Sequence, residues 1–166
     1  MMQNRRWFVT GSAVLLAGCG FQLRGAPDLA FRSLYVNAIE ASAFGNEIKR
    51  NLGALGALTL VTDAKAQSSA EVVLDILNEA REKTVVGVNT SGQVREFQLR
   101  TRLRFQLRTP QGKELIGPTE LLQQRDISFN ESAVLAKEAE EGLMYRDMQS
   151  DIVQQLIRRL AAVKSL

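Results

Sequence analysis

Three groups of residues in this sequence have types and spacings that could do chemistry. A single cysteine, Cys19, follows a short apolar stretch, arginines occupy every second position from Arg100 to Arg104, and acidic residues cluster between Glu138 and Glu141. The 166 residues contain no histidine, which excludes Ser-His-Asp, Cys-His and H-E-x-x-H sites. A lone cysteine excludes an intramolecular disulfide and a thiolate metal cluster. We therefore expect no catalytic residue and no metal site.

The cysteine ends a segment with the features of a secretory signal. Arg5 and Arg6 form a positive start, an apolar stretch covers residues 13–17, and small residues precede Cys19. The apolar stretch is far shorter than the roughly 20 residues that a membrane-spanning helix needs. The letters L-A-G-C at residues 16–19 resemble a bacterial lipobox, in which the cysteine is acylated and becomes the mature N-terminus. The alternative is a buried free cysteine that follows an ordinary helix.

Acylation of Cys19 predicts three segments: a signal peptide over residues 1–18, a lipidated tether over 19–30 and a single domain over 31–163. The covalent lipid is the only prosthetic group expected, and Gly20 after the cysteine is typical of outer-membrane lipoproteins. Residues 5 and 6 also resemble a twin-arginine signal, so the export route stays open. Cleavage removes two of 21 basic residues, leaving 19 against 18 acidic ones. Net charge therefore does not indicate nucleic-acid binding.

The arginines lie on the more regular of two predicted long strands. Apolar residues hold most odd positions from 97 to 107, whereas Arg100, Arg102 and Arg104 hold even ones, and this period of two predicts a half-buried strand. Arginines spaced by about 6.5–7 Å suit several phosphates of one large anion. The alternative is a solvated face on which they pair with Asp75 and Glu79. The polar face lacks interleaved aromatic residues, which argues against nucleic acid.

The preceding strand begins at Val72 and forms an antiparallel hairpin with the arginine strand. Polar and small residues at 89–92 predict its turn. For both apolar sets to share one face without a bulge, paired residue numbers must sum to an odd value near 181. This register pairs Ile76 with Phe105 and Glu79 with Arg102.

Shorter elements precede the hairpin. Residues 33–37 and 58–61 indicate strands, and residues 63–69 indicate a loop. Between the two strands, Phe44, Ile48 and Leu52 recur at helical spacing, with Ser42 as a candidate N-cap and Gly56 as a stop.

After the hairpin, a turn at residues 110–112 leads to a fourth long strand that ends near Phe129, with a break or bulge at Gly117-Pro118. A long final helix follows this strand, and Asn130 is its candidate N-cap. Gly142 could bend the helix or divide it into two segments. Its apolar stripe comprises Tyr145, Met148, Ile152, Leu156 and Leu160, widened by Val153 and Ile157. The pattern predicts an α+β two-layer sandwich with two helices on one face of a mostly antiparallel four-stranded sheet.

The acidic cluster does not predict an enzyme. Lys137 and Arg146 flank it, which is typical of a solvated helix face. A lipid-anchored hydrolase would need two carboxylates close together around a cleft. The sequence has neither a glycine-rich phosphate loop nor a G-x-S-x-G elbow.

Three motifs occur in order along the chain: C-G-F-Q-L-R-G at residues 19–25, V-L-A-K-E-A-E-E at 134–141, and Met148 leading to L-I-R-R-L at 156–160. Together they resemble the LptE family of lipopolysaccharide-assembly lipoproteins. The resemblance implies a small α/β sandwich that is not an enzyme. It also implies an outer-membrane lipoprotein with a lipid anchor on the periplasmic side. Its domain plugs the lumen of the β-barrel LptD, binds lipopolysaccharide and supports barrel assembly and delivery of lipopolysaccharide to the outer leaflet.

The resemblance also implies site residues. Lys137 matches a basic residue of the family helix motif and is the first candidate contact for lipopolysaccharide. The predicted hairpin tip, residues 88–92, lacks the cation that relatives place there. In this sequence we therefore expect the corresponding lipopolysaccharide contact at Arg95 or at the arginines at 100, 102 and 104. The alternative is a freestanding lipoprotein that scaffolds another envelope complex and binds no glycolipid.

Overall fold

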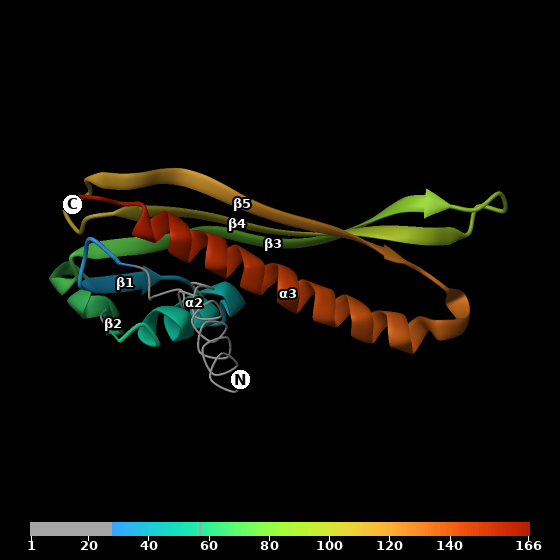
Figure 1. Cartoon of the computed structure of the whole chain (residues 1–166), viewed down its shortest axis with the longest axis horizontal. Helices are drawn as coiled ribbons and strands as arrows, with labels where there is room; N and C mark the ends of the chain where they lie inside the picture. The colour runs from blue at the N-terminus through green and yellow to red at the C-terminus, as the bar shows by residue number, and fades with distance from the viewer. Residues whose placement is uncertain (1–27, 57) are drawn as a thin grey trace, which may run out of the picture.

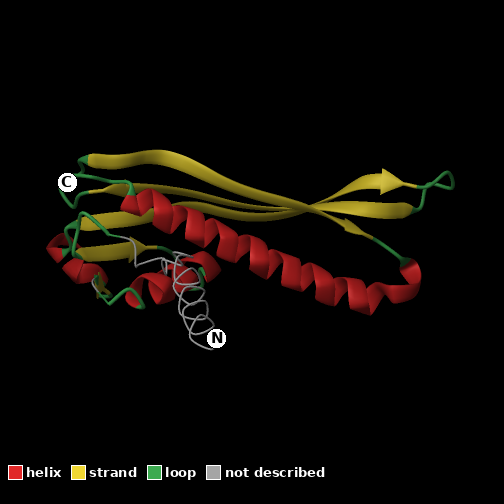
Figure 2. Cartoon of the chain, in the orientation of Figure 1, coloured by secondary structure: helices red, strands yellow, loops and turns green. Residues whose placement is uncertain are grey.

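The computed structural model describes residues 28–56 and 58–166, so the predicted signal peptide and Cys19 lie outside the described residues. The described chain is an α+β sandwich with both α-helices on one face of a five-stranded sheet (Figures 1 and 2). The elements follow the order β1 (Ser33–Asn37), α2 (Ala43–Gly53), β2 (Thr59–Val61), a 3₁₀ turn (Ala64–Ser69), β3 (Val72–Val88), β4 (Val94–Arg108), β5 (Glu114–Ser128), a second 3₁₀ turn (Glu131–Ala133) and α3 (Val134–Ala161).

The sheet is mixed, with the order β2-β1-β3-β4-β5. Strand β1 runs parallel to both β2 and β3, and the β3–β4 and β4–β5 pairs are antiparallel. The prediction of four mostly antiparallel strands was therefore wrong, although the α+β class and the two helices are confirmed. The parallel pairs exist because α2, and then the segment that contains the first 3₁₀ turn, each return the chain to the end of the sheet where β1 began. The predicted loop at residues 63–69 is largely a 3₁₀ turn.

The two helices begin differently. The side chain of Ser42 accepts a hydrogen bond from the backbone N–H of Gly45 at 2.6 Å, as predicted for the α2 N-cap. Asn130 instead caps the 3₁₀ turn by accepting from the N–H of Ser132, and α3 continues directly from that turn. Helix α3 runs unbroken through Gly142. No helix among residues 28–56 and 58–166 is both long and apolar enough to cross a membrane.

The hairpin has the predicted turn but only part of the predicted register. Ile76 pairs with Phe105 as expected, and then the register shifts between Ile76 and Asn78. Beyond this bulge Glu79 pairs with Leu103, and Arg102 pairs with Ala80, so the predicted Glu79–Arg102 pair is wrong. A bulge adds one residue to one strand and moves the following side chains to the opposite face. The bulge predicted at Gly117-Pro118 is confirmed by a register shift in β4–β5.

Two apolar clusters lie between the helices and the sheet. The proximal core joins α2 and the C-terminal half of α3 to β1 and the adjoining parts of β3, β4 and β5, and it contains Leu34, Leu74, Phe105 and Leu156. The distal core is built on Leu99, Ile127 and Met148, with partly buried Phe97, Met144 and Tyr145 around it. It lies where β3, β4 and α3 extend beyond α2 (Figure 1). We call the two parts of the molecule the proximal end and the distal end.

Candidate functional site

The three strand arginines face away from the helices. Leu103 is fully buried in the proximal core, so its neighbours Arg102 and Arg104 project from the opposite side of β4, which we call the open face. Arg100, Arg102 and Arg104 lie across from Gln124, Leu122 and Glu120 of β5. No helix of the described chain covers this face (Figure 2). The predicted row of cations therefore exists.

Only one of these three arginines has an ion-pair partner among the described residues. The guanidinium of Arg102 donates to the carboxylate of Glu82 on β3. Arg100 donates through Nε to the side-chain oxygen of Gln98 at 2.8 Å. The carboxylate that pairs with Arg102 is thus Glu82 rather than the predicted Glu79, because the bulge turned Glu79 toward α2, where it accepts from Ser42. Arg100 and Arg104 keep a positive charge available on this face.

Asp75 is the buried carboxylate at the proximal end of the open face, with 6% of its surface exposed. It accepts from Arg108 Nε at 2.7 Å, from Asn37 at 2.7 Å and from Gln106 at 2.9 Å. Burial raises the pKa of Asp75, but these three donors and the Arg108 charge outweigh it, so the pKa lies below its ordinary value. Asp75 is therefore a saturated structural carboxylate and is not available to a ligand.

Lys137 lies on the other side of the sheet, at the first turns of α3. Its ammonium group donates to Glu140 at 2.9 Å and to the hydroxyl of Ser128 at 3.1 Å. Its side chain is 22% exposed. Arg95 lies near the distal end of β4, at the register shift between the Gly87–Glu96 and Val88–Val94 pairs, so strand alternation does not assign its side chain to a face. Lys137 thus lies on the helix side of the distal end.

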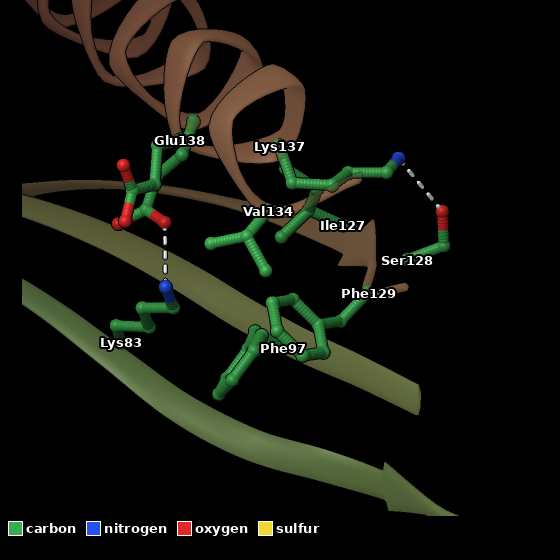
Figure 3. Close-up of a pocket in the computed structure, with 9 residues that line it drawn as sticks. Lys83, Phe97, Ile127, Ser128, Phe129, Val134, Lys137 and Glu138 are labelled. Atoms are coloured by element: carbon green, nitrogen blue, oxygen red, sulfur yellow. Dashed lines mark hydrogen bonds and ion pairs between the residues drawn. The ribbon is translucent and has the colours of Figure 1, made fainter. Parts of the chain in front are cut away.

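A pocket opens beside Lys137, between β4, the end of β5 and α3. Its volume is about 230 Å³, and it is lined by Lys83, Phe97, Ile127, Ser128, Phe129, Val134, Lys137, Glu138 and Glu141. Val134 points toward Phe97 and Phe129, and Lys83 and Lys137 lie on either side of them (Figure 3). The two phenyl rings meet edge to face at 5.3 Å between centroids. The pocket is apolar inside and charged at its rim.

Lys83 was not among the predicted site residues. Its ammonium group lies 4.3 Å from the centroid of the Phe97 ring and 2.6 Å from a carboxylate oxygen of Glu141. It reaches the helix side only because the bulge after Ile76 changes the face on which odd-numbered residues of β3 lie. Simple alternation places Lys83 on the open face. The sequence contains no strong signal for this bulge, so pattern reasoning had no means of finding this residue.

A polar layer separates the distal pocket from the proximal core. Arg81 donates to the side-chain oxygen of Gln149 at 2.7 Å, and Gln149 donates to Glu47 of α2 at 2.6 Å. The Thr101 side chain is fully buried beside them, and its hydroxyl has no hydrogen-bond partner among the described residues. Proximal core and distal core are therefore divided by polar groups.

Tyr145 connects α3 to β3 at the distal side of this layer. Its hydroxyl donates to the backbone carbonyl of Glu82 at 2.8 Å, and the Arg81 guanidinium lies 5.4 Å from its ring centroid. Burial raises the pKa of the Tyr145 phenol and the nearby Glu141 carboxylate raises it further, whereas Arg81 lowers it. The net pKa of Tyr145 lies above its ordinary value, so the phenol stays protonated and can donate its hydrogen bond.

The structure therefore does not bring the predicted site residues together. Arg100, Arg102 and Arg104 occupy the open face, Lys137 occupies the helix side, and Arg95 lies at an irregular position of β4 near the hairpin tip. The acidic cluster forms no site of its own, because Glu140 pairs with Lys137 and Glu141 pairs with Lys83. No group of three acidic or thiol residues in the described part of the chain is placed to hold a metal ion. The structure thus presents two candidate surfaces, one broad and polar and one small and amphipathic.

Comparison with known proteins places the chain in a family. The family model described as "LptE: Lipopolysaccharide-assembly" matches residues 31–160. The LPS-assembly lipoprotein LptE of Pectobacterium atrosepticum is 29% identical over 158 residues, covering 93% of this chain and 84% of that protein. The LPS-assembly lipoprotein LptE of Yersinia pestis is 31% identical over 157 residues, covering 92% and 73%.

Solved structures share the fold. Lipoprotein B of Nitrosomonas europaea superposes with a TM-score of 0.73 at 33% identity, covering 86% of this chain and 91% of that one. A minor lipoprotein of Acinetobacter baumannii superposes with a TM-score of 0.64 at 23% identity, covering 81% and 94%, and this likeness concerns the fold alone.

Proposed function

The chain belongs to the LptE family of lipopolysaccharide-assembly lipoproteins, a family without enzymatic activity, and from this premise we propose that it binds lipopolysaccharide and plugs the β-barrel LptD in the outer membrane. The family match carries the proposal, because residues 31–160 include all five strands and α3 except its last residue. In this role the protein supports barrel assembly and delivers lipopolysaccharide to the outer leaflet.

The anchor in this proposal is an acylated Cys19. Residues 1–18 are then a cleaved signal peptide, residues 19–30 a tether from the lipid, and residues 31–163 the domain within the barrel lumen. Several acyl chains on one cysteine bind a membrane firmly, because their buried CH₂ groups add together. Substituting Cys19→Ala should release the protein from outer-membrane fractions, and retention of the variant there would contradict the anchor.

The two surfaces have different parts in this proposal. Lys137 lies beside an apolar pocket, a combination that suits a ligand with both phosphates and acyl chains. Arg100 and Arg104 lie on the open face without ion-pair partners among the described residues and suit either further lipopolysaccharide phosphates or acidic groups of the barrel. A single small ligand does not contact both surfaces, because the sheet separates them.

Charge reversal separates the two surfaces. The variant Lys137→Glu is expected to weaken lipopolysaccharide binding about tenfold, the order of effect that loss of one charge-assisted contact produces. The conservative variant Lys137→Arg keeps the charge and is the matched control for Lys137→Glu. The double variant Arg100→Glu/Arg104→Glu tests the open face. Binding that withstands both reversals in folded protein would remove these residues from the ligand site.

Co-purification tests the partner. Isolation of the protein in mild detergent should bring along a very large β-barrel protein in a fixed ratio. Recovery of the protein without any barrel would contradict the plug and favour a freestanding lipoprotein that scaffolds another envelope complex.

A further inference from the structure

The distal pocket has the chemistry of a site for the end of an alkyl chain. Phe97, Ile127, Phe129 and Val134 give it an apolar interior. Its rim carries Lys83 on one side and Lys137 on the other (Figure 3). A pocket that is apolar inside and polar at its mouth matches an amphiphile, whose chain enters while its head group stays in water.

Size and charge narrow the choice of ligand. The volume of about 230 Å³ exceeds that of the engineered apolar cavity of about 150 Å³ that takes up benzene. Both rim lysines already have carboxylate partners, at 2.6 Å for Lys83 and 2.9 Å for Lys137. A free inorganic anion would have to compete with these carboxylates and would leave the apolar interior empty. The interior therefore determines the ligand, and the rim charges orient it.

We propose that this pocket binds one fatty acyl chain of the glycolipid ligand, with Lys83 and Lys137 at its mouth facing the polar head group. The inference rests on the proposed function, since the family acts on lipopolysaccharide, whose lipid part consists of acyl chains on a phosphorylated sugar. It assigns Lys83 to the site, and it separates recognition of the acyl chain inside the pocket from recognition of the head group at the pocket's mouth.

Blocking the pocket tests the proposal. Val134 lines it, whereas its neighbour Leu135 does not and is 81% exposed, so Val134→Trp and Leu135→Trp form a matched pair. The full-length lipidated protein is held in phosphatidylcholine nanodiscs, with protein-free discs as background. Two probes are titrated: intact lipopolysaccharide, and lipopolysaccharide stripped of all acyl chains but retaining its phosphates.

The wild-type protein should bind the intact probe more tightly than the deacylated one. Val134→Trp should reduce affinity for the intact probe about tenfold, the loss expected when about two methylene groups are displaced, and should leave the deacylated probe unchanged. Leu135→Trp should change neither affinity. Far-ultraviolet circular dichroism checks the fold, and Val134→Met replaces the tryptophan variant if that one unfolds at a lower temperature.

Three other outcomes overturn the proposal. Equal wild-type affinity for the two probes means that no chain is recognised, and equal effects of the two tryptophans mean that the pocket is not the site. If Val134→Trp spares lipopolysaccharide binding but lowers recovery of the barrel, the occupant is an apolar side chain of the partner. Wild-type protein that binds neither probe contradicts the proposed function itself, which distinguishes that failure from failure of the pocket.

Discussion

The proximal and distal ends of this molecule share β3, β4, β5 and α3, yet they bury apolar side chains to different extents. At the proximal end α2 and the second half of α3 cover a large core in which Leu34, Ile48 and Leu156 are fully buried, while Ile39 and Leu77 remain exposed. At the distal end α3 alone covers a small core of Leu99, Ile127 and Met148, and several large apolar side chains remain exposed, among them Val85, Val86, Val88 and Leu143.

This difference indicates that one end of the molecule mainly stabilises the fold and that the other end is suited to binding. Buried apolar area is the main source of folding stability, so the proximal core holds the fold together. Exposed apolar side chains next to cations contribute little to stability and are typical of binding surfaces. The polar layer at Arg81, Thr101 and Gln149 marks the border. We therefore infer that the proximal end stabilises the fold and that the distal end provides the surface for the proposed binding.

Truncation of one leucine at each end should give the largest contrast. Leu156→Ala should lower the free energy of unfolding by about 2–5 kcal/mol, because it opens a cavity in a fully buried core. Leu135→Ala should change it by less than about 0.5 kcal/mol, since that side chain is 81% exposed. Urea unfolding measures the free energy of unfolding of each variant. Similar losses of stability in Leu156→Ala and Leu135→Ala would contradict the proposal that the proximal core is the main source of stability.

An apolar substitution in the polar layer should raise the free energy of unfolding rather than lower it. Thr101→Val should raise the free energy of unfolding by about 1 kcal/mol, because it replaces a buried hydroxyl that has no partner with a methyl group of similar size. The matched control is Thr109, whose hydroxyl accepts from the N–H of Lys113 at 3.2 Å. Thr109→Val should lower stability by about 1 kcal/mol. A loss at Thr101 would mean that its hydroxyl has a partner in solution.

The two ends should also differ in how pH affects them. The pKa of Asp75 is lower in the folded chain, so its stabilisation is complete above about pH 4 and is lost as pH falls through the folded pKa. The pKa of Tyr145 is higher in the folded chain, so its stabilisation is complete below about pH 10 and is lost as pH rises through the folded pKa.

Urea unfolding at a series of pH values measures how the free energy of unfolding falls at acid pH, the acid limb, and at alkaline pH, the alkaline limb. We expect Asp75 at the proximal end to contribute to the acid limb and Tyr145 at the distal end to the alkaline limb. Asp75→Asn should flatten the acid limb and leave the alkaline limb, and Tyr145→Phe should do the reverse. An acid limb that persists in Asp75→Asn would show that other carboxylates cause it.

The parts of the fold that repeat along the sequence could be predicted from it. Alternation located β4, helical spacing located α2 and the stripe of α3, and the Ser42 cap, the turn at residues 89–92 and the bulge at Gly117-Pro118 followed from residue types. The two short N-terminal strands were placed in sequence, but their parallel pairing, and hence a fifth strand in the sheet, depends on distant contacts that no local pattern encodes.

The candidate site was predictable only in part, for one physical reason. The bulge after Ile76 moved Glu79, Arg81 and Lys83 to the helix side, and nothing in the sequence indicated it. The predicted pairing of Glu79 with Arg102 failed for that reason, and Lys83 was missed. Lys137 and the arginines at 100, 102 and 104 were identified from residue type, but the sheet between them places them on separate surfaces.

Photo-crosslinking in living cells tests most directly whether the distal end is the binding end. A photoreactive phenylalanine analogue replaces Val134 in the distal pocket or, in a separate strain, Leu122 on the open face, which is 47% exposed. We predict a lipopolysaccharide adduct from position 134 and a much weaker one, or none, from position 122. An adduct from position 122 alone would contradict the account and place the ligand on the open face.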